Sequence, residues 1–294
     1  MEFFGKRKIG TAQLLALVVS AIAIRAFIEI FLSTYTNVDP YYLGLCAEAF
    51  MYLLIGMGCV KPYLEYYRTI NNASISVIKM AGLTAAWAIV LLMFTYGSMA
   101  LVVIVASHFN VQGTYDYFHF HREKENVHGF LSTDVLTFFF VTIFIVPTIE
   151  EIVFRGILLK NLISRYGRLG GAIIVAFVFT AFHFLKPDYI GTFVFSLAAS
   201  AIYIAYGSIR YCILMHSIYN ALAFIYQDYF GEWWCRSNTQ LIGLDNWTGS
   251  LVLLGVSSFA IGVLFYIFRK YTAAANSPAD LISVIAQPVA SAAT

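Results

Sequence analysis

The chain has 294 residues, of which 60% are hydrophobic and only 12% are charged. This charged share is about half of that in soluble globular domains, which excludes a soluble protein and indicates a chain that crosses a membrane several times. The formal net charge is +2 and the sequence has no basic block, so we expect no nucleic-acid partner.

The apolar segments predict an all-α, polytopic bundle of about eight transmembrane helices, because a helix needs about 20 mostly apolar residues to cross a bilayer. In chain order the predicted spans cover residues 9–32, 41–60, 80–107, 135–159, 170–185, 190–207, 211–230 and 248–268. The sixth and seventh spans are the least clearly divided, since only Ser208, Ile209 and Arg210 lie between them.

The basic residues between the spans predict the orientation of the bundle. With the N-terminus inside, the inner segments carry twelve Lys and Arg residues and the outer segments carry four. Cytoplasmic loops of membrane proteins are enriched in Lys and Arg, so both termini are expected to be cytoplasmic. The inner residues are Lys6, Arg7, Lys8, Lys61, Arg68, Lys79, Lys160, Arg165, Arg168, Arg210, Arg269 and Lys270, and the outer ones are Arg122, Lys124, Lys186 and Arg236.

Three charged residues, Glu150, Glu151 and Arg155, interrupt the apolar run of the fourth span. Charges in such a run are costly unless they are paired or functional. On a helix, Glu151 and Arg155 are four positions apart and share a face, whereas Glu150 points about 100° away from Glu151. We therefore predict that Glu151 and Arg155 pair with each other and that Glu150 is left for chemistry.

Two later spans add further reactive side chains in apolar surroundings. His183 lies near the end of the fifth span, and His216 and Asn220 lie four positions apart in the seventh. A single histidine on an apolar helix is usually a satisfied polar group. Two histidines, an asparagine, two glutamates and an arginine in three spans of one bundle indicate a shared site.

Other polar residues have simpler interpretations. Arg25 and Glu29 are four apart in the first span and fit an ion pair inside the bundle, which Glu48 of the second span could join, although a gate or substrate contact is the alternative. Histidines also occur between the third and fourth spans, where a solvated loop is favoured over a metal site. They are His108, His119, His121 and His128.

Three motifs in this order resemble those of a known family. Glu150, Glu151 and Arg155 are similar to the EExxxR motif of the CPBP intramembrane proteases, which include the type II CAAX prenyl endopeptidases and many bacterial homologues. The stretch from Phe179 to His183 resembles the FxxxH motif of the family, and the stretch from His216 to Asn220 resembles its HxxxN motif. The resemblance covers about residues 134–230.

The resemblance implies hydrolysis of a peptide bond within or at the edge of the membrane. It assigns water activation to Glu150, a task that His183 shares, and oxyanion stabilisation to His216 and Asn220. Glu151 and Arg155 become supporting residues. The implied substrate is a membrane protein or a lipid-modified peptide.

The residues leave two mechanisms open. Glu150, His183 and His216 could supply two histidines and one carboxylate to zinc, with an open fourth position. The alternative is a metal-free glutamate mechanism, which we favour, with no cofactor. The other classes considered are a non-enzymatic member of the same family, acting in bacteriocin self-immunity or as a scaffold, and an ion-coupled transporter.

These expectations divide the chain into four parts of one bundle. Residues 1–133 hold the first three transmembrane helices and an outer loop, and residues 134–230 form the catalytic core. Residues 231–270 hold an outer loop and the eighth helix, and residues 271–294 form a cytoplasmic tail that we expect to be mobile. Low lysine content and short loops favour a multi-pass protein of a bacterial inner membrane.

Overall fold

A computed structural model describes residues 11–35, 47, 50–52, 54–57, 77–108, 139–183, 188–239 and 244–275. Every element in these residues is helical, which confirms the all-α fold. In chain order the helices are α1 (Thr11–Tyr35), α3 (Val77–His108), η1 (Val141–Ile145), α6 (Val146–Glu151), η2 (Ile152–Leu159), α7 (Lys160–Phe182), α8 (Tyr189–Tyr206), α9 (Ile209–Thr239) and α10 (Leu244–Ala275). Residues 50–52 and 54–57 are helical too.

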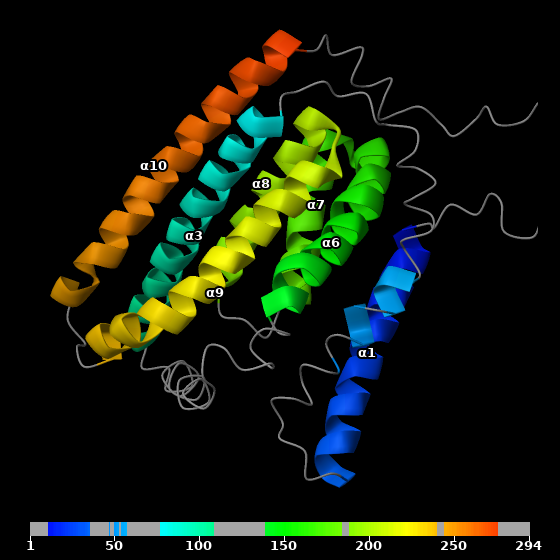
Figure 1. The fold of residues 1–294 in the computed structure, drawn as a ribbon, viewed down its shortest axis with the longest axis horizontal. Coiled ribbons are helices and arrows are strands. Elements are labelled where there is room, and N and C mark those ends of the chain that lie inside the picture. Colours follow the sequence, from blue (N-terminus) through cyan, green and yellow to red (C-terminus); the bar gives the residue numbers. More distant parts are fainter. Residues whose placement is uncertain are drawn as a thin grey trace, which may run out of the picture.

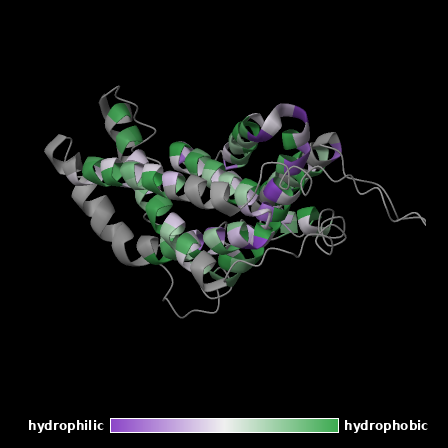
Figure 2. Cartoon of the chain, turned by 90° about the horizontal axis from the view of Figure 1, so that it is seen from above, coloured by the Kyte–Doolittle hydropathy of each residue, from purple (hydrophilic) through white to green (hydrophobic). Residues whose placement is uncertain are grey.

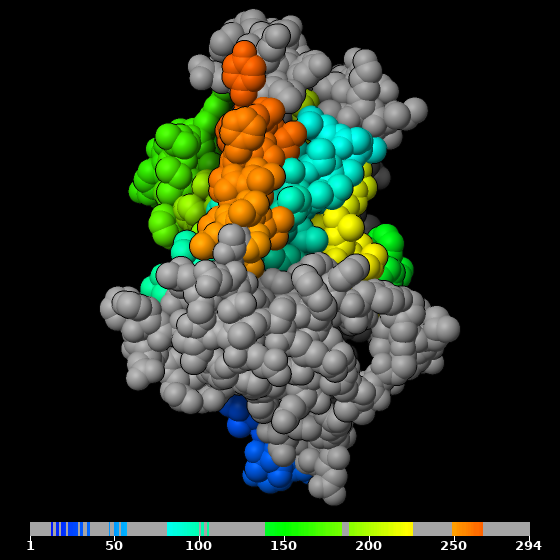
Figure 3. Space-filling view, turned by 90° about the vertical axis from the view of Figure 1, so that its left-hand side faces the viewer, coloured from blue at the N-terminus to red at the C-terminus, as the bar shows by residue number. Residues whose placement is uncertain are grey.

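The helices pack side by side in a bundle. Figure 1 shows α10, α3 and α9 in succession across the molecule, with α6, α7 and α8 beside them and α1 on the side opposite α10. The main packing partners are α3 with α10, α8 and α9, and α7 with α8. In the space-filling view, α10 lies on the outer face of the bundle beside α3 (Figure 3).

Three of the described helices are long and apolar enough to cross a membrane, at Ala81–Met99, Tyr189–Tyr206 and Gly249–Tyr266. Figure 2 shows hydrophobic residues along most of the helix lengths and hydrophilic ones gathered toward one end. The outer face of α10 is apolar and exposed, with Phe259 at 76% exposure, as expected where lipid covers a helix. The protein is therefore an integral membrane protein, whereas the count of eight spans and the orientation stay predictions.

The turn between the fourth and fifth predicted spans is shorter than expected. The structure has one tight turn at Gly167, whose positive φ of 74° suits glycine, and α7 includes helical residues on both sides of it. The division between the sixth and seventh spans is confirmed. Gly207, with φ of 61°, ends α8, and α9 begins at Ile209.

Helix α9 differs from its prediction in length. The apolar run predicted an end near residue 230, but the helix continues to Thr239. Hydropathy indicates where a helix leaves the hydrocarbon layer, whereas backbone hydrogen bonding can continue into water. Part of the outer loop expected after residue 230 is therefore helical.

Candidate active site

The two glutamates lie in α6, a six-residue α-helix between two π-helical segments. Pro147 stands at the start of α6 and has no N–H to donate, so the α-helical pattern begins again after the π-helical turn of η1. Both glutamates are buried, Glu150 at 2% exposure and Glu151 at 0%. π-Helical turns within α-helices are frequent at functional sites, and here two of them flank the segment that carries the buried carboxylates.

Glu151 and Arg155 form the predicted ion pair. Arg155 Nη1 lies 2.9 Å from Glu151 Oε1, and both side chains are fully buried. The second terminal nitrogen of Arg155 donates to Oγ of Ser196 in α8 at 2.9 Å and to the carbonyl of Ser196 at 3.3 Å. The guanidinium also lies 4.8 Å from the ring centroid of Phe179. The buried charge is thus compensated by one carboxylate, one serine and one aromatic face.

His216 shares the same carboxylate oxygen. Its Nδ1 lies 2.8 Å from Glu151 Oε1, and its Nε2 lies 3.7 Å from Glu150 Oε2. A carboxylate that pairs with an arginine is ionised and can only accept, so Nδ1 of His216 donates. In the neutral imidazole this leaves the lone pair on Nε2, directed at Glu150.

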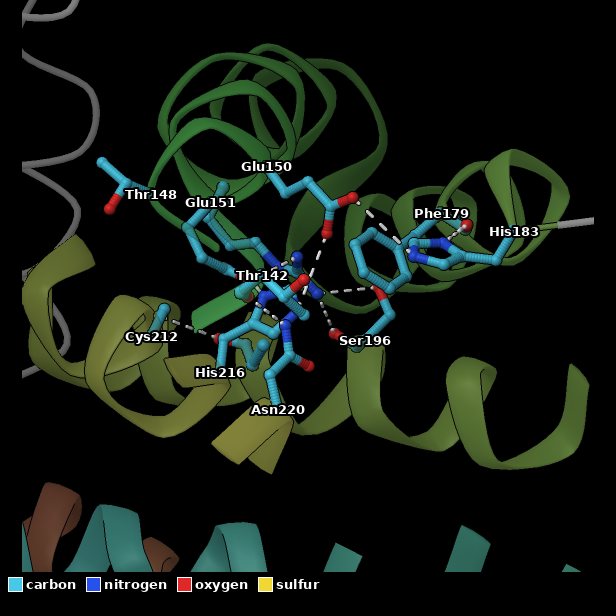
Figure 4. Close-up of polar contacts among 12 residues, drawn as sticks. Thr142, Thr148, Glu150, Glu151, Phe179, His183, Ser196, Cys212, His216 and Asn220 are labelled. Carbon is cyan, nitrogen blue, oxygen red and sulfur yellow. Dashed lines mark hydrogen bonds and ion pairs between the residues drawn. The ribbon is translucent and has the colours of Figure 1, made fainter. Parts of the chain in front are cut away.

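His183 approaches Glu150 from the other side. It caps the C-terminal end of α7, where its Nδ1 lies 2.9 Å from the carbonyl oxygen of Phe179. A carbonyl oxygen only accepts, so Nδ1 donates here too. Nε2 of His183 lies 3.7 Å from Glu150 Oε1. Figure 4 shows Glu150 between the two imidazoles.

Asn220 lies one helical turn after His216 on α9, as its spacing predicts, and both side chains appear on one side of the site in Figure 4. Its Nδ2 donates to the carbonyl oxygen of Thr142 in η1 at 2.9 Å. A primary amide carries two N–H groups, so this bond engages one of them. The bond holds the amide of Asn220 against the helix that carries the glutamates.

Two contacts of the site were not anticipated from the sequence. The hydroxyl of Tyr52 donates a hydrogen bond to Oε1 of Glu150, and Oγ of Ser196 accepts one from Arg155. Tyr52 belongs to the second predicted span and Ser196 to the sixth, and neither lies in a motif. A hydroxyl in an apolar span is common, so the sequence carried no signal that set these two apart.

Within the described ranges, no group of three or more His, Cys, Asp and Glu side chains is arranged to hold a metal ion. The two Nε2 atoms lie against different oxygens of one carboxylate, and Tyr52 also contacts one of these oxygens. This arrangement does not match a zinc site, in which the ligands surround one centre at about 2.0–2.2 Å. We derive no step through zinc, and the choice of a metal-free mechanism stays a prediction.

Several sequence predictions lie outside the described residues. They concern Glu48, the outer-loop residues His119, His121 and His128, and the tail from residue 276 onward. The side chains of Glu29 and His108 are also outside the description, so the predicted pair of Arg25 with Glu29 stays a prediction.

Part of the chain matches a known protein family. Residues 132–222 match the family model described as Rce1-like, Type II CAAX prenyl endopeptidase. The matched segment contains all three motifs and confirms the family expected from them, but it does not reach Tyr52. Searches among curated proteins and among solved structures found no match.

Proposed function

Because residues 132–222 belong to the Rce1-like family of type II CAAX prenyl endopeptidases, we propose that this membrane protein is an intramembrane endopeptidase with Glu150 as its general base. The family gives the reaction class, a membrane setting and a peptide substrate. The residue roles below are our assignment. The substrate is a membrane protein or a peptide with a lipid-modified cysteine near its C-terminus.

The observation that carries the proposal is the position of Glu150 between two imidazoles. Nε2 of His183 and Nε2 of His216 each lie 3.7 Å from a different oxygen of this buried carboxylate. A direct hydrogen bond needs a shorter distance, so the three groups lie around a point where a water can contact more than one of them. The side chain of His183 is 14% exposed, so we propose that the substrate approaches this point from the His183 side.

The proposed reaction needs water as its only co-reactant. The water gives a proton to Glu150, with His183 sharing this task, while its oxygen bonds to the carbon of the scissile carbonyl. The proton then passes to the leaving nitrogen as the C–N bond breaks. The negative charge that develops on the carbonyl oxygen requires donors in fixed positions. Our candidates are Asn220 and the protonated form of His216, whose Nε2 then carries a hydrogen to donate.

The supporting role of Glu151 follows from its contact with His216, and that of Arg155 follows from its contact with Glu151. Glu151 accepts from Nδ1 of His216, which sets the direction of the imidazole toward Glu150. Arg155 pairs with the same oxygen of Glu151 and is held by Ser196. A carboxylate behind a histidine orients the ring and stabilises positive charge on it, as in other hydrolases that use a histidine.

The arrangement in the membrane is part of the proposal. We propose eight spans with both termini cytoplasmic, so that substrate reaches the site from the cytoplasmic side or laterally from the lipid. The positive-inside charge distribution supports this orientation. A bacterial inner membrane is the location that we propose.

Cleavage by purified protein tests the function. The probes are a quenched fluorescent peptide that ends in a farnesylated CAAX sequence, its unprenylated counterpart and a transmembrane peptide. Glu150→Gln keeps the size of the side chain but loses the base, so we expect its kcat to be about 10²–10⁴-fold lower with a wild-type melting profile. Asn220→Ala should lose about 10²–10³-fold and retain a trace of activity. Substantial cleavage by well-folded Glu150→Gln would overturn the role of Glu150, whereas no cleavage of any probe by the wild type would favour the non-enzymatic class.

A further inference from the structure

A helical segment far from the matched family region packs on the helix that carries Glu150. Residues 50–52 and 54–57 are helical, and the ring of Tyr52 lies edge-on to that of Phe182, with centroids 6.4 Å apart. Further along the segment, a Cβ placed on Gly56 would lie 3.3 Å from Cδ1 of Ile149, the residue before Glu150. The segment therefore contacts both α6 and the end of α7, where His183 lies.

The hydroxyl group of Tyr52 contacts the carboxylate of Glu150. Tyr52 is 3% exposed and Glu150 is 2% exposed, so neither group can rely on bulk water for hydrogen bonds. The tyrosine hydroxyl donates to Oε1 of Glu150, although 98 positions separate the two residues in the chain. A buried tyrosine hydroxyl needs a partner, and a buried carboxylate needs donors, so this contact meets a requirement of both side chains.

The contact also involves the orientation of the carboxylate. The last torsion of a glutamate side chain is broad, so the helix alone does not set the plane of the carboxylate. His183 and His216 lie at 3.7 Å, too far to hold it by direct hydrogen bonds. The hydroxyl of Tyr52 belongs to a buried ring, and it donates to Oε1, the oxygen on the side of His183.

We propose that Tyr52 is a positioning residue for Glu150, and that the active site is completed by a segment outside the region that matches the family. This inference rests on the proposed function, because it assigns to Tyr52 the orientation of the general base. Tyr52 does not contact the substrate in this assignment. It acts through the carboxylate.

The first test compares two tyrosine-to-phenylalanine variants. Tyr52→Phe removes the hydroxyl and keeps the ring against Phe182. Tyr219→Phe is the matched control, since the hydroxyl of Tyr219 also makes a hydrogen bond within the bundle, to Oγ1 of Thr95 at 2.9 Å. With the farnesylated peptide as probe, we expect Tyr52→Phe to lower kcat by about 10- to 100-fold with an unchanged KM, because a misdirected catalytic group affects the chemical step. Tyr219→Phe should keep the wild-type kcat.

The second test measures coupling between the two residues without an activity assay. Melting temperatures are compared for Tyr52→Phe, Glu150→Gln and the double variant in detergent. If the hydroxyl stabilises the charged carboxylate by its hydrogen bond, Tyr52→Phe should lower the melting temperature of the wild type. In the Glu150→Gln background the same substitution should change the melting temperature much less. If Tyr52→Phe alone fails to fold, the double variant should fold, because it has no buried carboxylate at position 150 that lacks its hydrogen-bond donor.

The outcomes separate this inference from the function on which it rests. Loss of activity in Glu150→Gln together with wild-type kcat in Tyr52→Phe would overturn the positioning role and leave the peptidase assignment intact. Equal losses of kcat in Tyr52→Phe and Tyr219→Phe, or additive melting shifts in the double variant, would reduce Tyr52 to a packing residue. Cleavage by Glu150→Gln would instead overturn the role of Glu150 in the proposed function.

Discussion

The imidazole Nδ1 of His216 lies 2.8 Å from Oε1 of Glu151, so the second glutamate of the pair orients a histidine that faces the first. The two neighbouring carboxylates therefore have different surroundings. Glu151 is bound on the same oxygen by Arg155 and His216 and is fully buried. Glu150 faces two imidazole nitrogens and the hydroxyl of Tyr52. This division of contacts is the reason for assigning structural support to Glu151 and chemistry to Glu150.

Removal of the arginine should damage stability and activity together. Arg155→Ala leaves the buried carboxylate of Glu151 without its cation, and breaking a buried ion pair typically costs about 3–5 kcal/mol. We expect a clearly lower melting temperature and a lower kcat, because Glu151 also orients His216. The control is Arg165→Ala, which removes an exposed arginine of α7. This variant should keep a melting temperature and a kcat near those of the wild type. Wild-type stability of Arg155→Ala would argue against the pair.

Ser196, which accepts a hydrogen bond from Arg155, should contribute less to stability than the ion pair does. Ser196→Ala removes one acceptor from Nη2 of Arg155, while the carbonyl of residue 196 remains at 3.3 Å. A hydrogen bond to a charged group contributes about 1.5–3 kcal/mol, so we expect a loss of stability at the lower end of that range. Thermal unfolding of Ser196→Ala is compared with that of Ser164→Ala, whose hydroxyl bonds to its own helix at an exposed position. Equal melting temperatures for the two variants would contradict the role of Ser196.

Metal analysis distinguishes the two mechanisms that the residues left open. In the metal-free mechanism, chelators leave the purified wild type active, and His216→Ala changes no bound metal. In the zinc mechanism, His183→Ala and His216→Ala each release one equivalent of metal, because each would remove a ligand. The measurement is elemental analysis of active protein in detergent, before and after chelator treatment. We expect the metal-free result.

The orientation in the membrane can be measured with reporter fusions. A reporter placed after Lys270 should read as cytoplasmic, since inner segments carry twelve basic residues and outer segments four. A reporter placed in the predicted outer loop, after Lys124, should read as external. An external signal from the fusion after Lys270 would contradict the even number of spans or the orientation.

Local sequence patterns were sufficient to predict the helices and the contacts between residues that are close together on one helix. The apolar runs predicted helices in a membrane, and the spacing of Glu151 and Arg155 predicted an ion pair that lies at 2.9 Å. The π-helical turn that follows Glu151 did not separate the two side chains. The three motifs also identified the family. The ion pair could be predicted because helical periodicity places residues three and four apart on one face, whereas the family was identified by resemblance.

Tertiary packing decided how the groups around Glu150 are arranged. The approach of His183 and His216 to opposite oxygens, the sharing of Glu151 by His216 and Arg155, and the contact from Tyr52 all join different helices. No periodicity along the chain specifies which faces of separate helices meet, because that depends on side-chain packing across the whole bundle. For this reason the sequence indicated a site with Glu150 at its centre, whereas the contribution of Tyr52, 98 positions earlier, became visible only in the folded protein.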